Sequence, residues 1–226
     1  MTTNDQIHQD SNNYVNFCSF GTLCYSSTFL KRHKLKKESY PFDWVFSTPK
    51  IIIDCLETDF KYFLDKRYYT QDTTTFNNTN IYYYKSGLTM FNHHNPKREK
   101  DYEYYKRCID RFYKMLASPE KKLFIITFID KESYINLYFE NKVNRVYDTT
   151  KEDIIEFNEK LKKYTSNYTL LCIFQKKSDN IKHTFTSYDN IDFLDYESKS
   201  FTYGIHFLDE DDNTYISEII KNRYKL

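Results

Sequence analysis

Glycine is scarce in this chain of 226 residues, which has three glycines, four prolines and one tryptophan. A phosphate-binding loop needs several glycines close together, and the sequence has no such loop for a nucleotide. Neither sign of charge dominates, because 33 Lys and Arg face 32 Asp and Glu. The chain therefore has no global basic field that would attract nucleic acid or a membrane surface.

Long apolar runs are also missing, since no stretch approaches the length of a membrane span. The first thirteen residues are polar, unlike a signal peptide. We expect residues 1–13 to form a disordered tail and residues 14–226 to form a single domain. The five cysteines, at positions 18, 24, 55, 108 and 172, show no close pairs and are odd in number. They are typical of free thiols in a reducing cytoplasm.

The second half of the chain alternates helical and strand patterns. Helices are predicted over 99–117, over 149–164 after a capping box at Thr149, and over 209–224, where an acidic run suits a first helical turn better than a metal-nucleotide site. Continuous apolar strands are predicted over 123–129, 168–174 and 201–207, and 177–200 is ambiguous. Buried strands joined by helices predict an α/β fold, with a central parallel or mixed sheet flanked by helices.

The first half is predicted to form an N-terminal helical segment and a hairpin. One helix is expected over 22–35 and another from Pro49, because proline suits the first helical position. Residues 81–92 are expected to form a hairpin with its turn at 85–87. His93 and His94 would then follow a strand, and their side chains would point to opposite sides.

Cys24 follows Gly21 at the predicted start of the first helix. The glycine allows a tight turn, and the helix dipole favours an anion near Cys24, which lowers a thiol pKa. A nucleophilic thiolate needs that electrostatic environment. The alternative is a packed cysteine that acts as a small hydrophobic side chain.

His93 and His94 are the only paired histidines, and a Cys early in the chain with a His well downstream is the layout of a thiol hydrolase. Two adjacent histidines do not easily bind one ion, and no Cys or carboxylate stands at the usual metal-ligand spacing. We therefore expect no metal and no other cofactor.

The segment Pro41-Phe-Asp-Trp44 follows the first predicted helix. Phe42 and Trp44 are expected to plug the core while Asp43 caps a turn. Alternatively, Asp43 orients the catalytic histidine as the carboxylate of a triad does. Asn95 or Asp130, later in the chain, would suit the order of papain-type enzymes better.

The segments Gly21-Thr-Leu-Cys24, Ser39-Tyr-Pro-Phe-Asp-Trp44, Asp59-Phe60, Phe63-Leu64 and Phe91-Asn-His-His94 resemble a family of papain-like cysteine peptidases of unknown function. It occurs in bacteria and large DNA viruses, and the resemblance covers roughly residues 14–180. It implies Cys24 as the nucleophile, His93 as the base with His94 as the alternative, and Asp43 as a family-signature residue. Papain itself implies a helical lobe on an antiparallel barrel, whereas the periodicity here predicts α/β.

Two functional hypotheses follow. The first is a cytoplasmic cysteine-dependent hydrolase or acyl transferase, in the host cytoplasm if the chain is viral, acting on a peptide or another acyl or amide substrate. The second is a non-catalytic or carbohydrate-linked α/β binding domain. Neither involves nucleic acid or a membrane, and both leave the oligomeric state open. The distance from the Cys24 sulfur to the imidazoles of His93 and His94 separates the two hypotheses.

Overall fold

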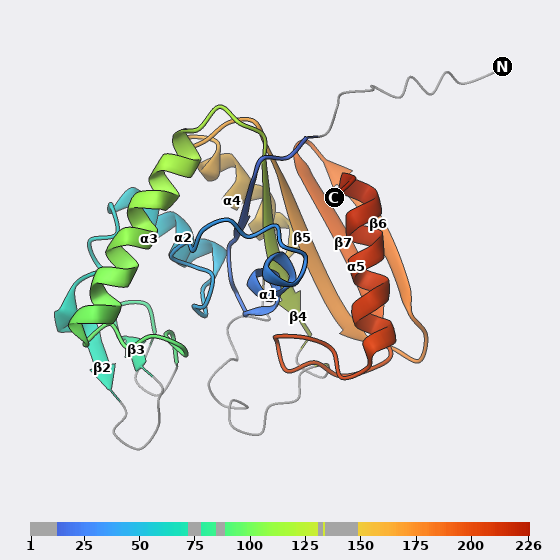
Figure 1. Ribbon diagram of the computed structural model, residues 1–226, viewed down its shortest axis with the longest axis horizontal. Coiled ribbons are helices and arrows are strands. Elements are labelled where there is room, and N and C mark those ends of the chain that lie inside the picture. Colours follow the sequence, from blue (N-terminus) through green and yellow to red (C-terminus); the bar gives the residue numbers. More distant parts are fainter. Residues whose placement is uncertain (1–12, 72–77, 85–88, 131–132, 134–148) are drawn as a thin grey trace.

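A five-stranded mixed sheet organises the computed structural model, which describes residues 13–71, 78–84, 89–130, 133 and 149–226 (Figure 1). The strand order is β1 (Asn16–Ser19), β4 (Lys122–Ile129), β5 (Tyr168–Lys177), β7 (Ile191–Ser198) and β6 (Lys182–Tyr188). The first four strands pair in parallel, and β6 runs antiparallel to β7. This arrangement confirms the predicted α/β class and differs from an antiparallel barrel.

Helices cover both faces of the sheet (Figure 1). One face packs against α1 (Tyr25–Arg32) and α5 (Glu210–Tyr224), and the other against α2 (Pro49–Glu57), α3 (Glu99–Ala117) and α4 (Lys151–Leu161). Successive side chains of β4 alternate between the layers, so Leu123 and Ile125 belong to the first core and Phe124 and Ile126 to the second. Burial on both faces is the reason that the strand is apolar throughout.

Most helices begin where local sequence signals, such as capping residues and proline, predict a helix start. Pro49 is the first residue of α2, and the Thr48 side chain accepts a bond from the Ile51 N–H at 3.2 Å. The capping box of α4 uses Thr150 with Asp153, one residue after the predicted Thr149. The acidic run lies in the first turn of α5, as predicted. None of the described helices is both long and apolar enough to cross a membrane.

The predicted hairpin over 81–92 is wrong in position. The antiparallel pair is instead β2 (Tyr69–Gln71) with β3 (Asn78–Asn80), and 81–84 form a turn. Asn80 causes the turn, because its side-chain oxygen accepts the Tyr82 N–H at 3.0 Å, so the chain leaves the extended state there. The predicted turn at 85–87 and almost all of the predicted tail at 1–13 lie outside the described residues.

The predicted strand over 201–207 is also wrong. Only Thr202 and Phe207 form a bridge there, because Gly204, with φ of 77°, reverses the chain between them. The strands of this region are β6 and β7, in the stretch that sequence patterns left ambiguous. β6 is an edge strand with exposed side chains, so it lacks the apolar alternation that marks a half-buried strand.

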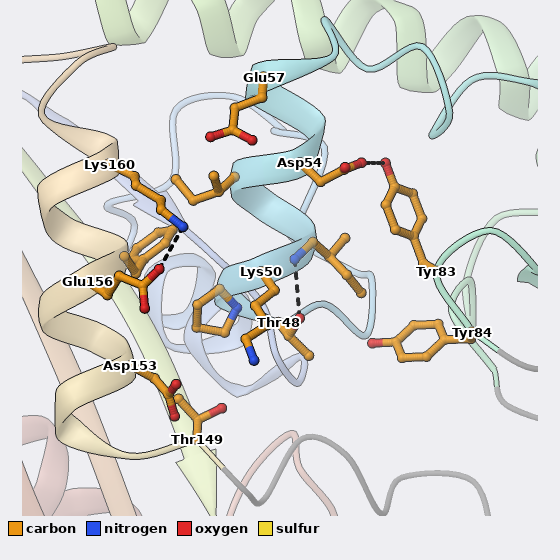
Figure 2. A pocket seen from close by; sticks show the side chains of 14 residues that line it. Thr48, Lys50, Asp54, Glu57, Tyr83, Tyr84, Thr149, Asp153, Glu156 and Lys160 are labelled. Carbon is orange, nitrogen blue, oxygen red and sulfur yellow. Dashed lines mark hydrogen bonds and ion pairs between the residues drawn. The ribbon is translucent and has the colours of Figure 1, made fainter.

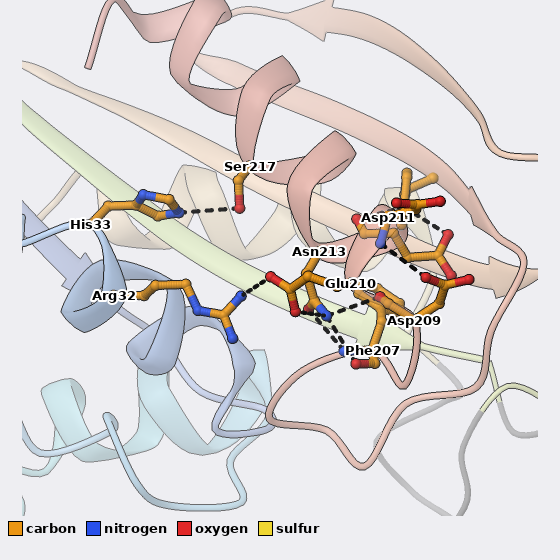
Figure 3. A network of polar contacts seen from close by, with 10 residues as sticks. Arg32, His33, Phe207, Asp209, Glu210, Asp211, Asn213 and Ser217 are labelled. Carbon is orange, nitrogen blue, oxygen red and sulfur yellow. Dashed lines mark hydrogen bonds and ion pairs between the residues drawn. The ribbon is translucent and has the colours of Figure 1, made fainter.

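Side-chain contacts join the end of α1 to the first half of α5 (Figure 3). His33 Nε2 lies 3.1 Å from Ser217 Oγ, and Arg32 lies 3.8 Å from Glu210. The Asn213 amide donates to the Phe207 carbonyl at 2.9 Å, while its oxygen accepts the Phe207 N–H at 3.0 Å. The loop from β7 into α5 is thereby held against α1.

Asp212, in the first turn of α5, binds the backbone of this loop, and its replacement tests how much the contact stabilises the fold. Its buried carboxylate accepts the backbone N–H groups of Lys199 and Ser200, at 3.0 and 2.8 Å. Asp212→Ala leaves these donors without a partner and is expected to lower the free energy of unfolding by about 2–4 kcal/mol. The exposed neighbour change Asp211→Ala should stay within about 0.5 kcal/mol. Urea unfolding measures both, and equal losses would contradict this role.

Candidate active site

Cys24 lies five residues beyond the end of β1, at the carboxyl edge of the parallel sheet. In open α/β sheets this edge is where ligands bind. β1 ends opposite Ile125, and the Phe20 N–H donates to the Ile125 carbonyl at 2.9 Å. β4 continues to Ile129, so the segment between β1 and α1 lies beside the last residues of β4.

Gly21 makes the turn between β1 and α1. Its φ is +75°, and a Cβ there would lie 2.3 Å from Ser47 Oγ and 2.9 Å from the Val45 carbonyl oxygen. Ser47 Oγ in turn donates to the Phe20 carbonyl at 2.8 Å. The turn therefore packs directly on the segment that follows Trp44, and only glycine fits at this contact.

Hydroxyl groups fix the start of α1 on β4. Thr22 donates to the Thr127 carbonyl, and Ser26 Oγ lies 2.8 Å from Thr127 Oγ1. Because Thr22 bonds the strand, α1 begins at Tyr25 and not at residue 22, with Cys24 as the N-cap residue. The helix ends at Arg32 because Lys34 adopts a φ of 59°, which leaves the predicted end at residue 35 outside it.

The structure brings Cys24 and His93 together, with 3.5 Å between Sγ and Nε2. A backbone bridge between Val45 and Phe91 sets up this contact, because it aligns the segment of Trp44 with the segment of His93. The ring of Trp44 meets the imidazole edge-on, with 5.3 Å between centroids. The imidazole thus lies between an aromatic ring and the thiol.

Burial sets the protonation of this pair. It raises the pKa of the Cys24 thiol to about 12, while the positive charge of Lys36 opposes the rise and Asp43 adds to it. The low thiol pKa that the helix start predicted is therefore wrong, because burial disfavours the charged thiolate. Burial also lowers the pKa of His93, and His94 adds to that effect. At neutral pH the pair consists of a thiol and an uncharged imidazole.

His94 points elsewhere. Its Nδ1 lies 3.2 Å from Asp101 Oδ1, and its ring stacks on Tyr104 with 4.1 Å between centroids. The other Asp101 oxygen accepts the Asn95 N–H at 2.9 Å. His94 therefore belongs to the junction with α3, and the two histidines face different neighbours. Residues 92 and 93 form a bend and Phe91 makes only isolated bridges, so the predicted strand before the histidines is wrong.

Asp43 bonds its own turn and a lysine. Its Oδ2 accepts the Tyr40 N–H at 2.8 Å and lies 2.6 Å from Lys36 Nζ, so the carboxylate is placed on these groups and not on His93. The two alternatives for a third group, Asn95 and Asp130, stay a prediction. The Asn95 side-chain oxygen accepts the Lys97 N–H at 3.0 Å, and Asp130 begins the segment after β4.

Trp44 and Lys36 are the site residues that sequence reasoning missed. Phe42 is fully buried against Phe60 and Phe112, as predicted, but Trp44 is only partly buried and does not plug the core. Residues 41–44 form a turn, so the alternation that would place both aromatic rings inside does not apply. The only sequence feature at Lys36 is the basic run after the first helix. Basic residues are common at helix C-termini, so this run does not mark Lys36 as a site residue.

A separate pocket of about 630 Å³ lies between α2 and α4 (Figure 2). Cys24 and His93 are not among its lining residues. Four of its polar side chains form two pairs, since Lys160 bonds Glu156 at 2.6 Å and Tyr83 bonds Asp54 at 2.9 Å. Reactive groups therefore converge at Cys24 and not in this pocket. Within the described ranges, no three His, Cys, Asp or Glu side chains are placed to hold a metal ion.

A family model described as "Putative papain-like cysteine peptidase (DUF1796)" matches residues 15–152, which is more than half of the chain. The matched region contains Cys24, Asp43, His93 and His94. Neither the curated proteins nor the solved structures include a match to the chain.

Gly21→Ala tests the contact that positions Cys24. The change combines left-handed strain with a clash against Ser47 and Val45, so we expect a loss of about 2–5 kcal/mol in the free energy of unfolding. Ser47→Ala removes the nearest atom. In a double-mutant cycle measured by urea unfolding, the double variant should lose less than the two single losses added together. Strict additivity would show that the two residues do not press on each other.

Proposed function

The chain belongs to the papain-like family that this model describes, and we propose that it is a cysteine-dependent hydrolase or acyl transferase with Cys24 as nucleophile and His93 as base. The observation that carries the proposal is the 3.5 Å separation of Cys24 Sγ and His93 Nε2. A thiol and an imidazole at this distance are within reach of direct proton transfer.

The first step is attack on an acyl carbon. Cys24 Sγ forms a bond to the carbonyl carbon, its proton passes to His93 Nε2, and the carbonyl electron pair moves to oxygen. Nε2 accepts a proton only when the neutral ring carries its hydrogen on Nδ1. Because burial keeps both partners neutral at rest, the proton moves during the attack, as in a serine–histidine pair, and not before it.

The start of α1 supports the oxyanion that this step creates. The first N–H groups of a helix have no acceptor within the helix, and they carry the positive end of its dipole. Cys24 as the N-cap makes no side-chain cap, and the first turn holds no acidic residue that would compete for those donors. Backbone N–H groups beside the nucleophile are the donors that acyl transfer needs.

The second step releases the leaving group. The imidazolium of His93 returns its proton to the departing nitrogen, oxygen or sulfur, and the acyl group stays on Cys24 as a thioester. Water, activated by His93, then hydrolyses the thioester, or an acyl acceptor takes the group. The cycle needs no other co-reactant and fits a peptide, amide, ester or thioester substrate.

The setting that we propose for this chemistry is the cytoplasm. All five cysteines are free thiols, which suits a reducing compartment. The balance of 33 basic and 32 acidic side chains favours a small acyl or peptide substrate over nucleic acid or a membrane surface.

Acylation by p-nitrophenyl acetate, with mapping of the modified peptide by mass spectrometry, tests the roles of the pair. We expect acylation at Cys24, lost in Cys24→Ser and slowed about 100-fold or more in His93→Gln, because the base is removed. His94→Gln is the matched control and should stay within about threefold, since His94 bonds Asp101. Equal slow modification of all five cysteines would leave the binding-domain alternative.

The pH dependence of acylation gives a second test. The active form of His93 is the neutral imidazole, which is present above its pKa and lost as the pH falls through it. Because burial and His94 lower that pKa from 6.5, the half-maximal rate should lie below pH 6.5. His94→Gln removes the neighbouring charge and should move the midpoint upward. A midpoint well above 6.5 would contradict an uncharged, buried base.

A further inference from the structure

Lys36 differs from the other lysines that follow α1, because its side chain is only 11% exposed. Its Nζ lies 2.6 Å from Asp43 Oδ2 and donates to Ser27 Oγ at 2.6 Å. The ammonium also lies over the ring of Trp44, 4.8 Å from the centroid. One cation therefore joins α1 to the turn of Asp43 and Trp44.

The same cation is connected to the candidate reacting pair. Trp44 touches Lys36 with its face and meets His93 edge-on at 5.3 Å, and His93 reaches Cys24 at 3.5 Å. A cation on the face of an indole is an attractive contact, and it restrains the ring that the imidazole packs against. Lys36, Trp44, His93 and Cys24 thus form one row of contacts.

Burial of the Asp43 carboxylate is unfavourable, and its ion pair with Lys36 offsets part of that penalty. Its side chain is 1% exposed, and Oδ1 has no hydrogen-bond partner within the described part of the chain. Burial raises the pKa of Asp43, while Lys36 and the Tyr40 N–H hold it down. A half-satisfied buried carboxylate is destabilising by itself, so its short ion pair with Lys36 is what keeps it charged.

We propose that Lys36 is a positioning residue of the Cys24–His93 pair, which holds Trp44 against the imidazole and brings a buried positive charge to this row of contacts. Asp43 then acts as the counterion that keeps Lys36 in place, and not as the group that orients His93. The inference rests on the function proposed above.

The two charged side chains near the Cys24 thiol shift its pKa in opposite directions, and this makes the proposal testable. Lys36 lowers the pKa of Cys24 and Asp43 raises it, with His93 as the direct neighbour and His94 acting on His93. Cys18, which is also buried, feels the same two charges. Charges in a buried site are weakly screened, whereas Lys37 is exposed and surrounded by water.

The rate of iodoacetamide alkylation of Cys24 at pH 8, followed by peptide mapping, tests the proposal. At a pH far below the thiol pKa, this rate follows the thiolate fraction. Lys36→Met should slow alkylation about 3- to 10-fold, and Asp43→Asn should accelerate it. The exposed neighbour change Lys37→Met is the control and should leave the rate unchanged.

The direction in which Asp43→Asn changes the alkylation rate shows whether Asp43 is the counterion of Lys36 or the group that orients His93. If Asp43 oriented His93, its loss would weaken the base and slow Cys24 alkylation, and the proposal would be overturned. It would also be overturned if Lys36→Met left the rate unchanged in a protein with the parent melting temperature.

A second pair of variants avoids the risk that Lys36→Met does not fold. Removing Lys36 alone leaves the Asp43 charge buried and unpaired, which is strongly destabilising. In the Asp43→Asn background that charge is gone, so adding Lys36→Met should slow alkylation relative to Asp43→Asn alone and bring it back near the parent rate. Equal rates for these two variants would overturn the proposal.

Failure of this inference is distinguishable from failure of the proposed function. If His93→Gln is acylated by p-nitrophenyl acetate as fast as the parent, the proposed function fails. If His93→Gln is acylated slowly, but Lys36→Met and Asp43→Asn do not change the alkylation rate in opposite directions, only the proposed role of Lys36 fails.

Discussion

The left-handed turn at Gly21 is the constraint on which the site depends. A Cβ at this position would lie within 3.1 Å of Ser47 Oγ and of the carbonyl oxygens of Phe42 and Val45. Only glycine lets the chain leave β1, touch that loop and enter α1 with Cys24 at its start. The Gly-x-x-Cys and Pro-Phe-Asp-Trp motifs are therefore the two sides of one contact, although about twenty residues separate them.

Burial then decides the chemistry that this contact makes possible. A helix start predicts a thiolate, but the pKa of Cys24 is raised to about 12 because the thiol is removed from water. The same loss of water lowers the pKa of His93, which keeps the imidazole unprotonated at neutral pH. In the proposed reaction, a buried neutral pair of this kind would transfer its proton only during attack on a substrate carbonyl. In the function that we propose, the site therefore has an unprotonated base and no preformed thiolate.

The helices and strands that depend on local sequence signals are the ones that were predicted correctly. The helix over 99–117 was predicted to the residue, because its apolar period and its break at Ser118 both lie within it or beside it. β6 was missed because an exposed edge strand has no apolar alternation. At the site, the residue types of Cys24 and His93 suggested a pair, but Trp44 and Lys36 act through tertiary contacts. No spacing in the chain indicates that a lysine from a basic run turns inward.

The family match and the fold divide the chain at different places. Residues 15–152 contain the pair together with β1 and β4, whereas β5, β7, β6 and α5 come later. β4 lies between β1 and β5, so without the later strands its backbone groups would be unpaired along one side. α1, which carries Cys24 at its start, also loses its contacts to α5 through Arg32 and His33. The geometry of the pair is therefore a property of the whole sheet, although the residues that form it all lie in the matched segment.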